Sequence, residues 1–169
     1  MPNQIKTILG VAIGIMALGG VLFFAQPKDQ NHSSMNNVPN GSTLDLRIDP
    51  TAYDFGNISM KNGLVTKVFN VKNTKPEKVF LSQLYTSCMC TNAKLRISGQ
   101  EFGPFGMQGH GAMKMLNQSL EPGQEAQLEV TFDPNAHGPS GIGVIERAIT
   151  IQSDRGEIAV MNIKANVTP

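Results

Sequence analysis

The stretch Gln127-Leu128-Glu129-Val130-Thr131-Phe132 alternates polar and apolar residues without interruption. Because successive side chains of a β-strand point to opposite faces, this period of two predicts a strand with one face buried and the other in water. The same alternation recurs in four other segments: 44–48, 69–72, 147–152 and 157–165. The last two of these segments are joined by Ser-Asp-Arg-Gly at 153–156, a short connection with glycine that predicts a hairpin.

Turn signals rich in proline, glycine and asparagine separate these segments, and no stretch of helical length with a 3.6-residue period follows residue 28. About seven short strands with regular turns are typical of a sandwich of two sheets. The sequence therefore predicts an all-β fold, an immunoglobulin-like antiparallel β-sandwich, over residues 44–169.

Composition excludes several classes of protein. The chain has 14 Lys and Arg against 13 Asp and Glu, so it lacks the basic surface by which proteins bind nucleic acid. Hydrophobic residues make up 40% of the chain, which is incompatible with a wholly disordered protein. Two cysteines are too few for a disulfide-stabilised scaffold.

The N-terminal segment 1–27 predicts a membrane anchor. Residues 7–27 carry no charge, and about 20 apolar residues span the hydrocarbon core as a helix. Lys6 precedes this span, which favours a cytoplasmic N-terminus and an extracytoplasmic remainder of a single-pass protein. A cleavable signal peptide ending near Ala17-Leu18-Gly19 is the alternative, and it also exports the rest of the chain. Residues 28–43 are mostly polar and predict a flexible linker.

Five motifs follow one another in order along the predicted sandwich. They are YDFGNI (53–58), FNVKNT (69–74), TSCMCT (86–91), LEPG (120–123) and VTFDP (130–134). This ordered set resembles the bacterial domain-of-unknown-function family 1573 (DUF1573). The resemblance implies an immunoglobulin-like sandwich related to hydin-type modules and an exported or anchored location, and it implies no settled activity. Two features depart from the family pattern: Met89 replaces a glycine, and residues 97–119 form a Gly- and Met-rich insertion.

Cys88 and Cys90 are separated by one residue, so on an extended strand they face the same side with Cα atoms about 6.6 Å apart. That separation is at the upper edge of disulfide geometry and predicts a strained, easily reduced bond. Two thiolates so placed also suit a soft metal ion. The third alternative is that both cysteines are simply packed in the core.

The insertion holds four further side chains with soft or borderline ligand atoms within nine residues. Thioethers and imidazole beside thiolates select Cu(I), whereas methionine that fills gaps in a folded loop, anchored by Phe102 and Phe105, is the competing interpretation. His137 lies in a predicted turn and is expected to face solvent. The candidate metal ligands, with Cu(I) as the candidate cofactor, are Cys88, Cys90, Met107, His110, Met113 and Met115.

None of the common catalytic motifs is present, neither a nucleophile elbow, a zinc-protease motif, a P-loop nor a dinucleotide-binding fingerprint. We therefore expect no enzymatic activity. The leading hypothesis is a membrane-anchored extracytoplasmic immunoglobulin-like module that binds other envelope proteins. One alternative is a Cu(I)-binding protein, and a second is a thiol-redox protein, although the CxxC sequence of thioredoxin-type enzymes is absent.

Overall fold

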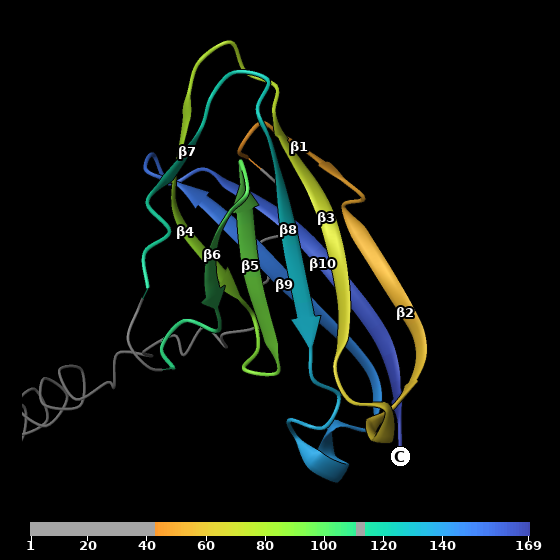
Figure 1. Ribbon diagram of the computed structural model, residues 1–169. Coiled ribbons are helices and arrows are strands. Elements are labelled where there is room, and N and C mark those ends of the chain that lie inside the picture. The colour runs from red at the N-terminus through yellow and green to blue at the C-terminus, as the bar shows by residue number, and fades with distance from the viewer. Residues whose placement is uncertain (1–42, 111–113) are drawn as a thin grey trace, which may run out of the picture. The chain divides into compact units, whose positions relative to one another are not determined.

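The computed structural model describes residues 43–110 and 114–169, which form two five-stranded β-sheets packed as a sandwich (Figure 1). The first sheet has the order β1-β3-β8-β5-β6 and the second the order β2-β10-β9-β4-β7. The strands of the first sheet are β1 (Leu46–Asp49), β3 (Val65–Asn73), β8 (Glu125–Phe132), β5 (Thr91–Ile97) and β6 (Gln100–Phe105). Those of the second are β2 (Ala52–Ser59), β10 (Ile158–Thr168), β9 (Gly143–Ser153), β4 (Val79–Thr86) and β7 (Gln118–Leu120). The all-β prediction is confirmed.

The strand arrangement differs from the prediction in two respects. The described residues contain ten strands rather than about seven. In addition, β2 runs parallel to β10, whereas the prediction was wholly antiparallel. The cause is the crossing between sheets after β1: Asn162 N–H donates to Thr51 O (3.1 Å), which seats the start of β2 beside the last strand. The predicted hairpin at 153–156 is confirmed, because β9 and β10 pair antiparallel across it.

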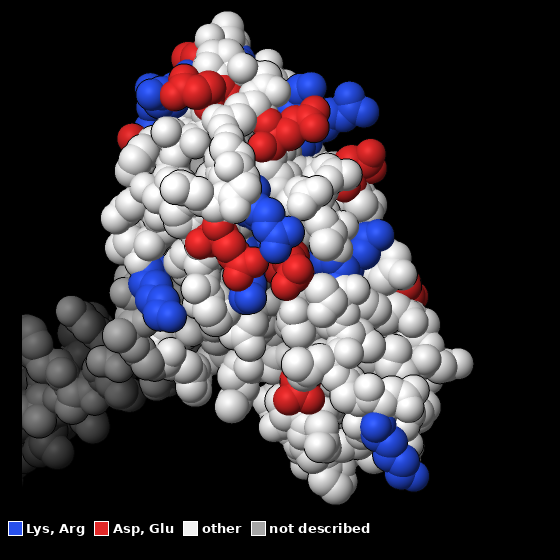
Figure 2. All heavy atoms as spheres, viewed as in Figure 1, with Lys and Arg blue, Asp and Glu red and all other residues white. Residues whose placement is uncertain are grey.

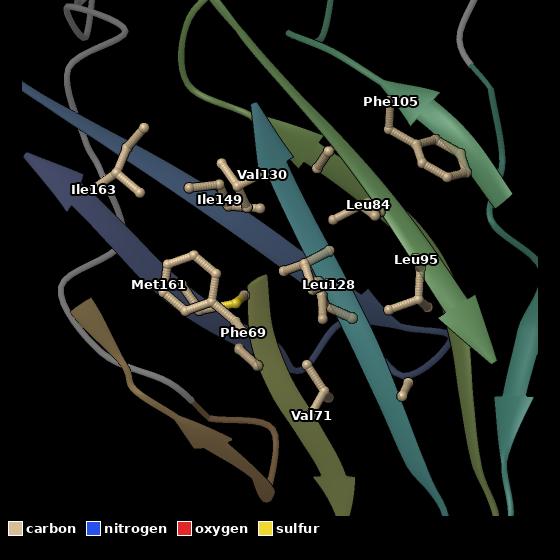
Figure 3. Close-up of a cluster of buried hydrophobic side chains, with 14 of the residues drawn as sticks. Phe69, Val71, Leu84, Leu95, Phe105, Leu128, Val130, Ile149, Met161 and Ile163 are labelled. Atoms are coloured by element: carbon tan, nitrogen blue, oxygen red, sulfur yellow. The ribbon is translucent and has the colours of Figure 1, made fainter. Parts of the chain in front are cut away.

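The core follows from the alternation of β8. Leu128, Val130 and Phe132 are all buried, and the residues between them face outward. Figure 3 shows Phe69 and Leu128 from the first sheet facing side chains of the second, among them Met161 and Ile149. Burying one such side chain contributes about 1.5–3 kcal/mol, so this interior holds the two sheets together.

Asn73, at the end of β3, fixes the turns at one end of the sandwich. Its side chain is fully buried, and its Nδ2 donates to the carbonyl oxygens of Glu77 (2.9 Å), Leu120 (3.0 Å) and Glu121 (3.2 Å). Its Oδ1 accepts from Lys75 N–H at 2.9 Å. One asparagine thus ties the FNVKNT motif to the LEPG turn, which gives both motifs a structural reason.

Helix is confined to two 3₁₀ turns in the described part of the chain, η1 (Met60–Asn62) and η2 (Gly138–Gly141). No helix among the described residues is long and apolar enough to cross a membrane. Residues 1–42 lie outside the described residues. They comprise the predicted anchor (1–27) and all of the predicted linker (28–43) except Thr43. Thr43, the last residue of that linker, is held by the sheet: its N–H donates to Ile158 O and its Oγ1 accepts from Ile158 N–H.

Candidate functional site

Cys88 and Cys90 lie in a tight turn between β4 and β5 and are joined by a disulfide. Because β4 ends at Thr86, the extended geometry predicted from the sequence is wrong. Thr91 N–H donates to Cys88 O at 3.1 Å and closes the turn, which brings the two Cα atoms to 5.3 Å instead of about 6.6 Å. This separation lies in the common range for disulfides. Of the three alternatives left open by the sequence, the structure therefore has the disulfide.

Hydrogen bonds from neighbouring strands hold this turn in place. The buried Thr86 hydroxyl lies 3.0 Å from Cys88 O and 2.9 Å from Thr91 O and donates to these carbonyl groups. Ser87 forms two bonds with Ala148 of β9: its N–H donates to the carbonyl oxygen, and its Oγ accepts from the N–H, both at 2.9 Å. The cysteines are thus presented on a fixed backbone.

The same turn is attached to the segment that follows β8. Asp133 N–H donates to Cys90 O at 2.8 Å, immediately after the strand ends. The carboxylate of Asp133 accepts from Asn135 N–H at 2.8 Å, a local turn that reverses the chain toward η2. Because the chain reverses here, His137, the residue before η2, lies next to the disulfide.

His137 contacts the more exposed sulfur of the pair. Its Nε2 lies 3.2 Å from Cys88 Sγ, and in the tautomer with a proton on Nε2 the ring donates to the sulfur. The histidine side chain is exposed to solvent, as predicted. An exposed imidazole in this position contacts both water and the sulfur atom.

Arg147 of β9 contacts the other sulfur. Its Nε–H donates to Cys90 Sγ at 3.3 Å, and its Nη1 donates to Glu146 O at 2.8 Å. Burial lowers the pKa of Arg147 from its ordinary value. A guanidinium nevertheless stays protonated in proteins, so a positive charge lies against Cys90.

The two sulfurs therefore differ in exposure. Cys90 is 1% exposed and belongs to the hydrophobic core, whereas Cys88 is only partly buried. Met89 between them is 55% exposed and projects from the turn. A reagent from solvent reaches Cys88 first, and Cys90 is the protected partner.

The predicted loop ligands are placed as follows. Met107 is half-buried and forms an isolated parallel bridge with Thr86, next to the turn, and Thr86 N–H donates to Gly106 O at 3.1 Å. His110 and Met115 are both exposed, and Met113 lies outside the described residues. The predicted insertion 97–119 thus contains strand β6, and after that strand it returns to the end of β4.

Ligand-type side chains do converge on the cysteines, but from another segment. Among the described residues, the group of cysteine, histidine and acidic side chains close enough to share an ion consists of Cys88, Cys90 and His137, with ligand atoms within 4.8 Å of one another. His110 does not belong to this group. It lines a separate pocket of about 400 Å³ with Gln83, Tyr85 and Met107, and neither cysteine lines that pocket.

Sequence reasoning identified the cysteines, placed His137 in a turn without assigning it to the site, and missed Arg147. The register explains the histidine: β5 pairs antiparallel with β8, and Thr91 lies opposite Phe132. Residues just before 91 and just after 132 must therefore meet at the same end of the sheet. The motifs TSCMCT and VTFDP flank this point, so pairing these two strands would have provided the missing signal.

The surface around the turn is poor in charge. In Figure 2 most charged side chains lie over the upper end and the middle of the visible face, and fewer lie at the lower end, which carries η2. The turn, the residue after η2 and the start of β9 contribute exposed apolar side chains, namely Met89, Ile142 and Val144.

Comparison with solved structures identifies matches of low sequence identity. A protein of unknown function from Porphyromonas gingivalis W83 has a TM-score of 0.51 and 15% identity, over 77% of this chain and 51% of that one. The VesB protease of Vibrio cholerae has a TM-score of 0.45 and 13% identity, over 73% and 32% of the two chains. This chain therefore spans half the length of the first protein and about a third of the second, and at 15% identity the likeness to the first concerns the fold alone. Comparison with curated proteins gives no match.

A family model does match the sequence. Residues 46–103 match the family described as a protein of unknown function, DUF1573. The matched region runs from the start of β1 into β6 and includes the Cys88–Cys90 turn, whereas the LEPG and VTFDP motifs follow it. The resemblance predicted from the sequence is confirmed over residues 46–103, which lie in a β-sandwich of two five-stranded sheets.

Proposed function

We propose that this domain is a thiol–disulfide exchange module, in which the Cys88–Cys90 pair passes two electrons to or from a dithiol of a partner protein. The observation that carries the proposal is the unequal environment of the two sulfurs. Cys88 is accessible and contacts His137, whereas Cys90 is buried and contacts Arg147. A purely structural staple needs no such division of roles. A bond that closes so short a loop also adds little stability.

In the reducing direction, a thiolate of the partner attacks Cys88 Sγ and breaks the bond to Cys90. Cys90 leaves as a thiolate, and the Arg147 guanidinium stabilises its negative charge through Nε–H. The rate of exchange rises when the leaving thiolate is stabilised. The positive charge of Arg147 therefore lies beside Cys90, the cysteine whose sulfur becomes negative when the disulfide breaks.

In the second step, the other thiolate of the partner attacks its own sulfur in the mixed disulfide and releases Cys88 as a thiolate. His137 Nε2 stands within hydrogen-bond distance of this sulfur and can donate its proton to it. The partner ends as a disulfide and has lost two electrons, which the sulfurs of Cys88 and Cys90 have gained. The protons of its two thiols pass to water when the thiols ionise, water returns a proton to His137, and Cys90 remains a thiolate beside Arg147. The reverse sequence oxidises the pair.

The location and the type of partner follow from the proposal together with the sequence. Disulfides persist in oxidising compartments, which supports an extracytoplasmic domain held by the predicted anchor. The exposed apolar side chains of Met89 and Ile142 suit a polypeptide partner with an apolar contact surface. The predicted binding to envelope proteins is thereby retained as the encounter that precedes exchange. The domain transfers electrons between protein thiols.

The test uses single-cysteine variants of the reduced full chain and glutathione disulfide as the probe. The variant Cys90→Ser retains Cys88 and should form a mixed disulfide with glutathione readily, which mass spectrometry detects as one adduct per chain. The variant Cys88→Ser retains only the buried Cys90. Its reaction with glutathione disulfide should be at least about tenfold slower, since a buried thiol is inert.

A far-UV circular dichroism spectrum of each variant establishes that it is folded. If Cys90→Ser does not fold, Cys90→Ala replaces it, because alanine adds no polar group to the core. Equal adduct rates in the two variants, or no adduct with Cys88 in a folded chain, would overturn the proposed exchange.

A further inference from the structure

We propose that, once the disulfide is reduced, Cys88, Cys90 and His137 bind one Cu(I) ion, and that oxidation of the pair releases it. This inference goes beyond thiol exchange because it assigns a ligand to the reduced state. It also replaces the predicted loop histidine, His110, with a residue from the turn that follows β8.

The geometry suits three-coordinate binding. The two Sγ atoms and one ring nitrogen of His137 lie within 4.8 Å of one another. Metal–ligand bonds of about 2.0–2.3 Å place three ligand atoms around one ion roughly 4 Å apart. Rotation of the freed cysteine side chains is therefore sufficient, and the backbone of the turn, held by Thr86 and Ser87, need not move.

The chemistry of the ligands selects the ion. Two thiolates and an imidazole are soft and borderline ligands, and the group contains no carboxylate, which Mg²⁺ and Ca²⁺ require. Three protein ligands also leave a tetrahedral Zn²⁺ site open, whereas structural zinc sites in proteins are closed by four.

Charge favours a monovalent ion over a divalent one. Two thiolates carry a charge of −2, and the Arg147 guanidinium beside Cys90 contributes +1. No ion pair joins Arg147 to an acidic side chain in the described part of the chain. One Cu(I) brings the sum to zero, whereas a divalent ion leaves an excess positive charge in a partly buried site.

Neighbouring donors orient the thiolates for this role. Cys90 N–H lies 3.4 Å from Cys88 Sγ and donates to it, and Arg147 Nε–H donates to Cys90 Sγ. Hydrogen bonds of this kind fix the ligand atoms around a metal and tune its affinity.

Release is coupled to the redox state in a balanced way. When a disulfide of a partner protein oxidises the pair, two electrons pass from the two thiolates to that disulfide, which becomes a dithiol. The Cys88–Cys90 bond forms, and Cu(I) leaves without changing its own oxidation state. Of the three ligands, only His137 then retains its full donor capacity, which is too little to hold the ion.

The experiment adds Cu(I), as its coloured bicinchoninate complex, to the full chain without oxygen, after dithiothreitol has reduced the pair and has been removed. We expect the reduced chain to take up one Cu(I), seen as loss of the colour of the complex, and the oxidised chain to take up none. His137→Ala should weaken Cu(I) binding by at least about tenfold. Loss of a residue that only hydrogen-bonds a metal ligand already weakens binding by about that factor, and His137 is itself a proposed ligand.

His110→Ala is the matched control and should bind like the wild type. Three results would overturn the metal site. The first is equal Cu(I) affinity of His137→Ala and the wild type, the second is weaker binding by His110→Ala but not by His137→Ala, and the third is Cu(I) uptake by the oxidised chain. The glutathione adduct assay contains no copper, so its outcome separates a failure of this inference from a failure of the proposed exchange.

Discussion

His137 Nε2 lies 3.2 Å from Cys88 Sγ, although 49 positions separate the two residues in the sequence. The contact exists because β5 and β8 pair antiparallel and leave the CxC turn and the turn before η2 at the same end of the sheet. It places an exposed proton donor on the accessible sulfur of the pair. The predictions below test what that donor, its counterpart Arg147 and the surrounding turns contribute.

Removing the imidazole should slow reduction of the disulfide by dithiothreitol, used as a simple dithiol. General acid–base groups contribute roughly 10²–10⁴-fold in enclosed sites, and His137 is exposed, so we expect a rate about tenfold lower for His137→Ala. Stopped alkylation followed by mass spectrometry measures the rate. His110→Ala should react like the wild type, and an unchanged rate in His137→Ala would mean that the contact has no role in exchange.

Arg147→Met should make the disulfide harder to reduce. The guanidinium stabilises the Cys90 thiolate that exists only in the reduced state, through a charge-assisted hydrogen bond. Loss of a bond of about 1.5–3 kcal/mol lowers the reduction potential by roughly 30–60 mV. Redox titration against glutathione measures the shift. Arg96→Met, which removes an exposed arginine of β5, should leave the potential unchanged, and a higher potential in Arg147→Met would contradict the assigned role.

The fold should not depend on the disulfide. A bond that closes a loop of three residues contributes roughly 1.6 kcal/mol by the loop-entropy relation, about half the value for a 15-residue loop. Urea unfolding of the chain with and without a reductant should therefore show a small shift of the midpoint and a folded reduced state. Loss of the β-sheet spectrum on reduction alone would show that the cysteines serve stability and would count against the exchange role.

Asn73→Ala should destabilise the sandwich strongly. The substitution removes three donated hydrogen bonds and leaves the carbonyl oxygens of Leu120 and Glu121 without this donor near the core. A buried group without its partner costs about 1–3 kcal/mol, so we expect a loss of roughly 3 kcal/mol in the free energy of unfolding. Asn70→Ala, at an exposed position of the same strand, should change it by less than about 0.5 kcal/mol. Similar losses in both variants would refute the role of Asn73.

Much of the fold was predictable because the alternation of 127–132 and of the last two strands reflects burial directly. Leu128, Val130 and Phe132 are inside, and the final hairpin forms where the turn residues indicate. The parallel pairing of β2 with β10 was not predictable, since it depends on where the chain crosses between sheets after β1. Local sequence carries no record of that crossing.

The candidate site was predictable only in part, for the same reason. Cys88 and Cys90 stand out by their spacing, and the nearest histidine along the chain, His110, was the natural third ligand. The structure instead brings His137 and Arg147 to the sulfurs through strand pairing, over separations of 49 and 57 residues. The sequence close to Cys88 and Cys90 does not show which distant residues the pairing of strands brings to the two sulfurs.

The reduction potential of the Cys88–Cys90 pair tests the central claim most directly. The full chain is equilibrated in glutathione buffers of known potential, the free thiols are alkylated, and mass spectrometry gives the reduced fraction. An exchange module should show one two-electron transition between about −270 and −120 mV, the range of dithiol oxidoreductases. A pair that stays oxidised to below about −300 mV would behave as a structural disulfide and contradict the account.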